Sequence, residues 1–559
     1  MNCSGAQILV EELIKHGVKT VFGYPGGAVL DIYDELYRNA HRIEHIISAH
    51  EQGAAHAADG YARVTGKPGV VIATSGPGAT NLVTGIANAY LDSIPMVAIT
   101  GNVAVSLLGR DSFQEVDIIG ITQPIVKHSY IVRKVEELEF VLSEAFWLAS
   151  TGRKGPVLVD IPKSVQKELC EYPGSRRHSS PPSSQVSDLD LTEALKFIAN
   201  SKRPYIYCGG GVLAAEAEEE IVSLSQRLSA PVGLSMMGLT AIPASYPLNL
   251  GMSGMHGKYA ASMAQSKADL ILAVGVRFSD RATGNVAEYT KNCTVIHIDI
   301  DEAEIGKNIT SVVELCGDAK AILQKLLEKL PLARQEEWLE TVAAYRKKDE
   351  CREKELYFTP GNILRYIANA VPPETVVATD VGQHQMWTMQ HYRFERTRTL
   401  LTSGGLGAMG FGLGASIGGC VGNEKKPTLL FTGDGSFGMN LNELATAVSQ
   451  QLPILIVLFN NGVLGMVRQW QYMFYEERYS STTLGRKTDF VQLAKAFGAD
   501  GKTIHSMDEL KQAFSQGFPS DGPFLLDCRI DGNERVYPMI PPGGSVKDMM
   551  MQQGGEAHE

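Results

Sequence analysis

Two polar motifs in the last third of the chain combine residue types that can hold a metal ion and a phosphate group. Asp434 lies in the tetrapeptide GDGS directly after the apolar run Thr428–Thr432, and Asn461 follows the apolar run Ile454–Phe459. A helix predicted over Leu441–Gln451 makes this segment one strand–helix–strand unit, whose strands usually lie close together in a parallel sheet. We therefore expect Asp434 and Asn461 to meet at the carboxyl edge of that sheet, where ligands bind.

The chemistry of these side chains suits a hard cation. One carboxylate and one amide carbonyl are oxygen ligands for Mg²⁺, which keeps further positions for water and phosphate oxygens. Gly435 and Ser436 offer a backbone N–H and a hydroxyl to the same phosphate at a helix start. The alternative is that GDGS is only a strand–helix turn and that Asn461 only caps a strand. The spacing of the two motifs favours a magnesium and diphosphate site.

Short apolar runs alternate with amphipathic stretches along most of the chain, as expected of strands joined by helices. The first third contains the predicted strands Val18–Phe22, Arg42–Ser48, Val70–Thr74, Met96–Thr100 and Val157–Asp160. The middle third contains Pro204–Cys208, Leu270–Val274 and Val295–Ile300, and the last third Thr375–Thr379, Thr428–Thr432, Ile454–Phe459 and Phe524–Cys528. This alternation predicts an α/β protein built from three doubly wound parallel-sheet domains.

Changes of composition divide the chain into domains and connections. The predicted domains are residues 1–170, 189–340 and 359–545, with a Ser- and Pro-rich linker at 171–188, a helical connection at 341–358 and a tail at 546–559. The stretch Lys325–Glu355 is rich in Glu, Lys and Arg, so we expect it to be solvated helix. The sequence leaves open whether the two outer domains are duplicates of one fold.

Charge and cysteine content exclude several classes of protein. The 559 residues carry a formal charge of −11, which gives no attraction to nucleic acid or to anionic membranes. No apolar run approaches the ~20 residues of a membrane span, and the N-terminus lacks a signal-peptide pattern. We expect a cytoplasmic protein that binds neither nucleic acid nor membrane. Its thiols should be reduced and mostly buried, since no metal-ligand spacing joins Cys3, Cys170, Cys208, Cys293, Cys316, Cys351, Cys420 and Cys528.

The two polar motifs and their flanks resemble a known enzyme family. GDG followed by NN at this distance is similar to the thiamine-diphosphate signature, and GDGSFGMNLNELATA, LPILIVLFNN and LGMVRQWQYMFYEERYS resemble the catalytic subunit of acetohydroxyacid (acetolactate) synthases. The resemblance extends over nearly the whole chain through VFGYPGGAVLDIYD, SAHEQGAAHAADGYAR, TSGPGATNLVTGIANAYLDSIPM, GPVLVDIP and TSGGLGAMGFGLG. It implies three domains of the thiamine-diphosphate-enzyme type.

The resemblance assigns the thiamine diphosphate site residue by residue. Glu51 matches the acid that hydrogen-bonds the pyrimidine N1′, Met409 the side chain under the bent cofactor, and Gly407 the carbonyl that receives the 4′-amino group. On the residues alone, a helix cap would be the preferred interpretation of Glu51, and Met409 could equally fill a gap in the core. The remaining matches are Gln383, His384, Gly435 and Ser436 near the diphosphate, Tyr24, Pro77 and Asn81 in cofactor binding, and Gln114 and Lys163 in catalysis.

The middle domain resembles the flavin-binding domain of the biosynthetic enzymes. Gly209-Gly210-Gly211 follows a predicted strand, and the strand VIHIDID ends in acids, of which Asp299 or Asp301 could accept from a ribose hydroxyl. A lone GGG is often only a turn, but the segment RFSDRATG is present here and differs in the flavin-free catabolic enzymes. The resemblance therefore implies FAD as a cofactor, with Arg153, His256, Arg277 and Asp318 near the flavin.

The implied reaction joins two 2-keto acids. Pyruvate is decarboxylated on thiamine diphosphate, and its hydroxyethyl unit condenses with pyruvate or 2-ketobutyrate to give 2-acetolactate or 2-aceto-2-hydroxybutyrate, precursors of branched-chain amino acids. Arg277 and Trp470 match acceptor-side residues, although Trp470 could be a core aromatic and Arg277 a surface ion pair or a flavin contact. Asn102 and Ala104 depart from the Gln and Pro of many relatives near the expected access channel.

The family also implies partners, and several alternatives stay open. Its active sites lie between subunits, which implies a homodimer or a higher homo-oligomer, and a small regulatory subunit is possible. The alternative activities are a flavin-free catabolic acetolactate synthase, a pyruvate oxidase and a glyoxylate carboligase, the last of which should not need an acid at Glu51. A non-catalytic nucleotide-binding scaffold would be expected to lack Glu51 or the pair Asp434 and Asn461, and all three are present.

Overall fold

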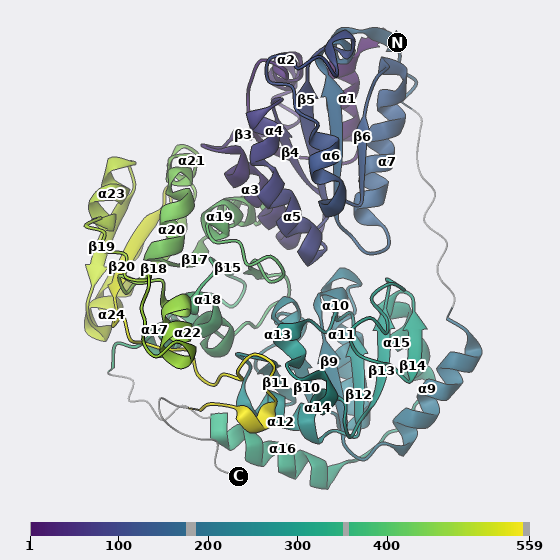
Figure 1. The fold of residues 1–559 in the computed structure, drawn as a ribbon, viewed down its shortest axis with the longest axis vertical. Coiled ribbons are helices and arrows are strands. Elements are labelled where there is room, and N and C mark those ends of the chain that lie inside the picture. The colour runs from purple at the N-terminus through teal and green to yellow at the C-terminus, as the bar shows by residue number, and fades with distance from the viewer. Residues whose placement is uncertain (1, 175–185, 350–356, 552–559) are drawn as a thin grey trace.

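The computed structural model describes residues 2–174, 186–349 and 357–551 and shows three α/β units grouped around a common centre (Figure 1). Each unit contains one six-stranded sheet in which every pair of neighbouring strands is parallel. Helices cover both faces of these sheets, so most strands consist almost entirely of buried apolar residues. The predicted fold class, three doubly wound parallel-sheet domains, is confirmed.

The first unit has the strand order β3-β2-β4-β5-β7-β6. Its strands are β2 (Thr20–Tyr24), β3 (Glu44–Ile47), β4 (Gly69–Ala73), β5 (Met96–Asn102), β6 (His128–Ile131) and β7 (Pro156–Pro162). Its main helices are α1 (Gly5–Lys15), α2 (Leu30–Arg38), α3 (Glu51–Thr65), α4 (Pro77–Asn81), α5 (Val83–Asp92), α7 (Leu138–Ser150) and α8 (Lys163–Lys167). A separate antiparallel pair joins β1 (Asn2–Ser4) to β8 (Leu169–Glu171).

The third unit repeats the connectivity of the first, with the strand order β16-β15-β17-β18-β20-β19. Its strands are β15 (Val376–Thr379), β16 (Leu400–Leu401), β17 (Thr428–Gly433), β18 (Ile454–Asn460), β19 (Asp500–Ile504) and β20 (Phe524–Arg529). Its main helices are α17 (Pro360–Ala370), α18 (Gln383–His391), α19 (Phe411–Gly422), α22 (Gly465–Phe474), α23 (Phe490–Ala496) and α24 (Met507–Gln516). The two outer units therefore share one strand topology, a point that the sequence left open.

The middle unit is connected differently, in the order β11-β10-β9-β12-β13-β14. Its strands are β9 (Pro204–Cys208), β10 (Val232–Leu234), β11 (Asn249–Met252), β12 (Leu270–Val274), β13 (Thr294–Asp299) and β14 (Val313–Cys316). Numbered within the unit, this order is 3-2-1-4-5-6, which is the dinucleotide-binding topology with its ligand crevice between the first and fourth strands. Those two strands are β9 and β12.

Helices α3 and α19 hold the first and third units together. A Cβ atom at Gly60 would lie 2.2 Å from the carbonyl oxygen of Ala415, and one at Gly418 would lie 1.8 Å from that of Ala57. Glycine at these positions therefore allows the two backbones to approach each other closely. Because α3 begins at Glu51 and α19 follows the loop that carries Met409, this packing fixes two of the predicted site segments relative to each other.

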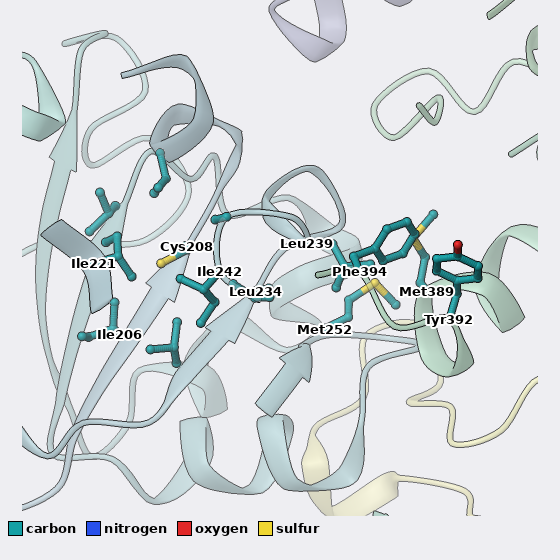
Figure 2. Close-up of a cluster of buried hydrophobic side chains, with 14 of the residues drawn as sticks. Ile206, Cys208, Ile221, Leu234, Leu239, Ile242, Met252, Met389, Tyr392 and Phe394 are labelled. Atoms are coloured by element: carbon teal, nitrogen blue, oxygen red, sulfur yellow. The ribbon is translucent and has the colours of Figure 1, made fainter. Parts of the chain in front are cut away.

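An apolar interface joins the middle and third units. Leu239, Ile242 and Met252 belong to the same buried cluster as Met389, Tyr392 and Phe394 at the end of α18 (Figure 2). Figure 2 shows these side chains lying between the middle sheet and that helix end. The middle and third units are thus packed against each other through a shared apolar cluster.

Two predictions about helices need correction. The predicted helix Leu441–Gln451 is present as a 3-10 turn at Leu441–Glu443 followed by α21 (Leu444–Ser449), and a separate helix, α20 (Asp434–Asn440), directly precedes it. The break occurs at Asn440, whose φ is −133° and whose side-chain amide donates to the carbonyl of Gly410 at 2.9 Å. Asn440 thus ends α20, and its side chain contacts the loop that leads into α19.

The stretch Lys325–Glu355 is not simply solvated helix. It covers the end of α15 (Ala319–Lys329) and α16 (Glu336–Asp349), and α16 packs on α12 (Tyr259–Lys267). Trp338 and Val342 of α16 are buried, and the indole N–H of Trp338 donates to the carbonyl of Pro204 at 3.0 Å. A one-sided apolar stripe among many charges anchors α16 to the middle unit.

Some sequence predictions fall outside the described residues. These are most of the linker 171–188, the end of the helical connection 341–358, the last residues of the tail 546–559, and Cys351. The other seven cysteines are free thiols, of which Cys3, Cys208, Cys420 and Cys528 are buried. Within residues 2–174, 186–349 and 357–551, no helix combines the length and the apolar character needed to cross a membrane.

Substitution of Gly418 by Ala should weaken the contact between α3 and α19. The new methyl group would meet the backbone of Ala57, which cannot rotate away, so we expect the free energy of unfolding to fall by about 1–3 kcal/mol. Gly422→Ala in the same helix is the control, because its nearest neighbour is a Thr65 methyl group at 3.2 Å. Denaturant unfolding of both variants measures the difference, and equal stabilities would contradict this account of the packing.

Candidate active site

The structure brings Asp434 and Asn461 together at one sheet edge. Strands β17 and β18 pair in parallel with Gly433 opposite Phe459, so that both polar residues follow neighbouring strand ends. A carboxylate oxygen of Asp434 accepts from the backbone N–H of Gly462 at 3.1 Å. Burial raises the pKa of Asp434 to about 6, and a bound cation would oppose this shift by favouring the carboxylate.

These ligands alone do not complete a metal site. Among the described residues there is no cluster of three or more His, Cys, Asp or Glu side chains suited to a metal ion. Asp434 and Asn461 supply a single carboxylate and a single amide, so a hexacoordinate ion here would need oxygens from water and from a phosphorylated ligand. Binding of the metal and of such a ligand should therefore be coupled.

Gln383 and His384 begin α18 beside the same edge. A Cβ atom at Gly433 would lie 2.9 Å from Nδ1 of His384, which places the imidazole ring against the GDGS turn. The Nε2 atom of His384 is buried without a hydrogen-bond partner. Burial lowers the pKa of the His384 imidazole to about 3, so the ring is neutral. The side-chain amide of Gln383 donates to the carbonyl of Glu534 at 2.8 Å. The unpaired His384 nitrogen is free to meet a polar ligand.

Gly407 and Met409 lie in the loop between β16 and α19. Gly407 has a φ of +68°, and Met409 is half-buried. The terminal methyl group of Met409 would lie 3.9 Å from a Cβ atom built on Gly435. The loop therefore places the Met409 side chain over the turn that carries Asp434.

A second group of predicted residues gathers at the carboxyl edge of the first sheet. The side-chain amide of Asn81 in α4 donates to a carboxylate oxygen of Glu51 at 2.9 Å. Lys163, the first residue of α8, donates from Nζ to the carbonyl of Gly27 at 2.9 Å. Tyr24, Pro77 and Gln114 lie in adjoining segments, Tyr24 at the end of β2, Pro77 at the start of α4 and Gln114 against Gly76.

The start of α3 is fixed from the third unit by a residue that the sequence analysis missed. The carboxylate of Glu443 accepts from the backbone N–H groups of Ala49 at 3.2 Å and of His50 at 2.9 Å. These are the two residues before Glu51, so Glu443 fixes the turn that presents it. No sequence signal could show this contact, because the partners lie 394 and 393 residues apart.

The two groups remain separate within one chain. In the described part of the chain, no hydrogen bond or ion pair joins Glu51, Asn81 or Lys163 to Asp434, Asn461 or His384. Large apolar side chains are also exposed near both groups, namely Tyr24 and Leu30 in the first unit and Leu406, Met439 and Val467 in the third. Each group therefore lies beside exposed apolar side chains of its own unit.

A central cavity of about 1950 Å³ is lined by residues of all three units. This volume exceeds the ~300–1,000 Å³ typical of small-ligand pockets, so the cavity has room for a dinucleotide-sized molecule. Its wall includes many of the residues that the sequence analysis selected, namely Arg153, Gly209, Gly210, Gly211, His256, Arg277, Asp299, Asp318, Gly407, Met409 and Trp470. One continuous space thus joins the middle-unit residues to the Met409 loop.

The crevice between β9 and β12 forms one end of this cavity. A Cβ atom at Gly209 would lie 1.9 Å from the carbonyl oxygen of Gly275, so the two strand ends approach too closely for a side chain there. His256 has a buried Nδ1 without a hydrogen-bond partner, and burial lowers its pKa to about 4. Bare backbone and an unpaired polar atom are suited to a ligand that lies along these strand ends.

Three predicted flavin-side residues have protein partners in the structure. The guanidinium group of Arg153 binds Asp301 at 3.1 Å and Glu304 at 2.7 Å, which links the first unit to the loop after β13. Asp299 accepts from the backbone N–H of Asp301 at 3.0 Å, and burial raises its pKa to about 6. Asp318 caps the start of α15 by accepting from the N–H of Ala321 at 2.9 Å.

Trp470 and Arg277 face the cavity rather than the core. Trp470 in α22 is half-buried, and the guanidinium carbon of Arg281 lies 5.2 Å from its ring centroid. The sequence alternative that Trp470 is a core aromatic is therefore wrong. Arg277 has no ion pair with any described residue, and a Cβ atom at Gly405 would lie 3.1 Å from its Nη2 atom. Arg281 was not selected from sequence, although it lies in the same RFSDR segment.

The two departures from the family pattern lie at the end of β5 and just beyond it. Asn102 is buried, and its side-chain amide donates to the carboxylate of Asp160 in β7 at 2.6 Å. Thr100 donates to the other oxygen of the same carboxylate at 2.7 Å. Asn102 thus binds a neighbouring strand, and neither Asn102 nor Ala104 contributes to the wall of the central cavity.

Comparisons with known proteins agree with this arrangement. Three protein-family models of thiamine pyrophosphate enzyme domains match this chain. They are the N-terminal TPP binding domain at residues 3–121, the central domain at 191–326 and the C-terminal TPP binding domain at 380–528. The acetolactate synthase isozyme 2 large subunit of Escherichia coli is 45% identical over 98% of this chain and 99% of its own length.

Proteins of two other organisms are also similar. The acetolactate synthase large subunit of Buchnera aphidicola from Schizaphis graminum is 42% identical over 98% of this chain and 99% of its own length. The probable acetolactate synthase large subunit of Methanocaldococcus jannaschii is 43% identical over 98% of this chain and 95% of its own length. The chain therefore belongs to the acetolactate synthase large-subunit family of thiamine-diphosphate-dependent enzymes.

Proposed function

We propose that this chain catalyses the acetolactate synthase reaction, which condenses pyruvate with a second pyruvate or with 2-ketobutyrate. The products are 2-acetolactate and 2-aceto-2-hydroxybutyrate, with release of CO₂. One observation carries the proposal: Gly407 and Met409 share a cavity wall with Arg277 and Trp470. A cationic and an apolar side chain suited to a 2-keto acid thus lie in the same space as the loop assigned to the thiamine cofactor.

The third unit has the residues to hold the diphosphate end of the cofactor. Asp434 and Asn461 would bind Mg²⁺, and the buried, unpaired Nε2 of His384 would meet a diphosphate oxygen. Gly435 and Ser436 offer donors at the start of α20, and a Cβ atom at Gly435 would clash with Leu464 at 2.7 Å. These features fit thiamine diphosphate, which supplies the carbanion chemistry that decarboxylates pyruvate and transfers its two-carbon unit.

The first unit would hold the pyrimidine ring. Glu51 would share a proton with the ring nitrogen N1′, and the bond from Asn81 would keep its carboxyl group oriented. Gly407 would accept from the 4′-amino group, and Met409 would support the bend of the cofactor. Tyr24 and Pro77 would line the ring, whereas Gln114 and Lys163 would contact the substrate.

We propose a homodimer or a higher homo-oligomer in which Glu51 of one subunit meets Asp434 of another. The separation of the two groups within one chain and the exposed Tyr24, Leu30 and Met439 beside them support this arrangement. Apolar patches of this kind commonly mark protein interfaces. The name "large subunit" borne by the relatives also supports a small regulatory subunit as a further partner.

FAD is the proposed occupant of the middle-unit end of the cavity. The dinucleotide-binding strand order, the bare glycines at β9 and β12, and the unpaired His256 nitrogen support it. Arg153, Asp299 and Asp318 would lie along the flavin nucleotide, with Arg277 between the flavin and the acceptor. We assign residues 1–170 to the pyrimidine ring, 189–340 to FAD and 359–545 to the diphosphate.

The direct test is an assay of the purified chain with pyruvate, Mg²⁺ and thiamine diphosphate, with and without FAD. We expect acetolactate to form, with bound FAD in the protein or a rise in activity when FAD is added. Oxygen consumption in place of acetolactate would favour a pyruvate oxidase. Full activity without any flavin would instead identify a catabolic acetolactate synthase.

Glu51→Gln should retain cofactor binding and lose most of the activation of the cofactor. The amide cannot share a proton with N1′, and a positioned acid or base typically contributes about 10²–10⁴-fold. We therefore expect exchange of the cofactor C2 proton to slow by at least ~100-fold, as measured by hydrogen–deuterium exchange. Glu44→Gln, an exposed change in β3, is the control. A normal exchange rate in Glu51→Gln would refute the assignment.

Asp434→Ala should weaken binding of Mg²⁺ and of thiamine diphosphate together. With a single carboxylate at the site, its loss should reduce both affinities by about 10–100-fold or more, as titration calorimetry can measure. Asp489→Ala, which removes an exposed helix cap in the same unit, should leave both affinities unchanged. Loss of only one of the two affinities would show that the ion does not bridge protein and diphosphate.

Trp470→Leu should change the choice of acceptor. One methylene in an apolar pocket contributes about 1–3 kcal/mol, so preference for 2-ketobutyrate over pyruvate should fall roughly tenfold or more. Both products are measured from one mixture of the two acceptors. Tyr472→Leu, on the same helix but outside the central cavity, should leave the product ratio unchanged. An unchanged ratio in Trp470→Leu would remove this residue from the acceptor site.

A further inference from the structure

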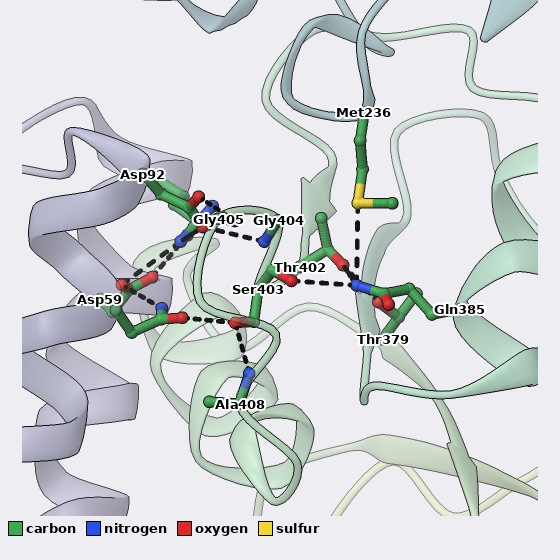
Figure 3. Close-up of polar contacts among 12 residues, drawn as sticks. Asp59, Asp92, Met236, Thr379, Gln385, Thr402, Ser403, Gly404, Gly405 and Ala408 are labelled. Atoms are coloured by element: carbon green, nitrogen blue, oxygen red, sulfur yellow. Dashed lines mark hydrogen bonds and ion pairs between the residues drawn. The ribbon is translucent and has the colours of Figure 1, made fainter. Parts of the chain in front are cut away.

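The loop that carries Gly407 and Met409 is attached to the first unit by one buried carboxylate. Asp92, the last residue of α5, accepts from the backbone N–H of Gly404 at 3.1 Å and of Gly405 at 2.7 Å through its two oxygens (Figure 3). The side chain of Asp92 is fully buried. Asp92 thus holds two successive amides directly before Leu406 and Gly407.

Arg63 of α3 holds this carboxylate in place. Its Nη2 atom donates to Asp92 at 2.8 Å, and its Nε atom donates to Asp59 one helical turn earlier. Burial disfavours the charge on Arg63, but the carboxylates of Asp59 and Asp92 outweigh this and raise its pKa. Charge-assisted hydrogen bonds of this kind are stronger than neutral ones, so Asp92 is a firm anchor for the loop.

The same cluster holds the loop at a second point. The side-chain NH₂ of Asn88 donates to Asp59 at 3.0 Å, and the hydroxyl of Ser403 donates to the side-chain amide oxygen of Asn88 at 2.5 Å. The Ser403 hydroxyl also accepts from the backbone N–H of Ala408 at 2.9 Å. Figure 3 shows this chain of contacts running from the helices of the first unit into the loop.

Gly407 lies between these anchors with no hydrogen bond of its own. Beyond it, the N–H of Gly410 donates to the carboxylate of Asp380 at 2.8 Å, which fixes the start of α19. Among the hydrogen bonds of the described residues, none involves the backbone of Leu406 or Gly407. The direction of the Gly407 carbonyl is therefore set by the residues held on either side of it.

We propose that Asp92 is a positioning residue, whose contacts with Gly404 and Gly405 set the Gly407 carbonyl and the Met409 side chain for the thiamine cofactor. This inference rests on the proposed function, which assigns the pyrimidine ring to those two residues. The competing interpretation is that Asp92 only joins the first and third units. The two interpretations differ in whether stability or cofactor activation changes more.

Asp92→Asn is the informative variant because it keeps size and shape. The new NH₂ group must point either at the N–H of Gly405 or at the N–H of Gly404 and the guanidinium group of Arg63. In both orientations one hydrogen-bond donor faces another, so at least one of the present contacts is lost. We expect amide hydrogen exchange of residues 404–409 to accelerate at least tenfold in the cofactor-free full chain. In the holoenzyme, C2 proton exchange and kcat should fall about 10–100-fold, because small misplacements at a reacting centre have effects of this size. Cofactor affinity and the KM for pyruvate should change less than threefold.

Asp349→Asn is the matched control. Asp349 also accepts from two successive backbone amides, those of Tyr259 and Ala260, both at 2.9 Å, but it does so at the start of α12. The Asp349→Asn variant should have a lower melting temperature and an unchanged rate of C2 proton exchange. If Asp92→Asn and Asp349→Asn affect only stability to a similar extent, Asp92 is a structural contact and the proposal fails.

Ser403→Ala tests the same loop without disturbing a buried charge, so it keeps the proposal falsifiable if Asp92→Asn does not fold. It removes the acceptor for the Ala408 N–H and should also accelerate amide exchange in 404–409 and slow C2 exchange. If a folded Ser403→Ala protein shows normal amide exchange in residues 404–409 and normal C2 proton exchange of the cofactor, the proposal is overturned. Neither exchange measurement uses a keto acid, so these results stay distinguishable from failure of the wild-type protein to form acetolactate.

Discussion

The close contact between α3 and α19 is the constraint on which the arrangement of the site depends. At Gly60 and Gly418 the two helix backbones come so near that no side chain could fit between them. The contact therefore leaves little freedom for the first unit to shift or rotate on the third. Because Glu51 begins one helix and the Met409 loop leads into the other, the placement of both segments within the chain depends on two glycines that are not themselves predicted site residues.

Buried carboxyl groups supplement this close backbone contact where the two units meet. Glu443 reaches from the third unit to the start of α3, and Asp92 reaches from the first unit to the loop before α19. Each carboxylate is compensated by backbone N–H groups, and Asp92 also by Arg63, so that neither remains buried without partners. Hydrogen bonds of fixed direction specify the positions of these loops more narrowly than apolar packing does.

The three units use the same type of sheet to position different groups of residues. The outer two share a strand order and present polar residues at their carboxyl edges, whereas the middle unit has the dinucleotide-binding order and presents bare glycines between β9 and β12. The central cavity is lined by segments that follow strands of the middle and third sheets, such as Gly209–Gly211 and the loop with Met409, and by segments of the first unit that precede its strands, such as Asp92–Pro95. Within this cavity, the Met409 loop and Trp470 of the third unit share one space with Arg277 of the middle unit.

The sequence by itself determined the parts that depend on short-range rules. The strand Leu270–Val274 could be delimited from its apolar run, and the meeting of Asp434 with Asn461 could be predicted because one crossover connects their strands. Only the tertiary structure decided the break at Asn440, the partial burial of α16 through Trp338, and the anchoring of Gly404 and Gly405 by Asp92. Asp92 and its two amides are 312 and 313 residues apart, and no local pattern records such a contact. It arises only when α5 and the loop are brought together by the packing of α3 on α19, because hydrogen bonds act over a few ångströms in space and not along the chain.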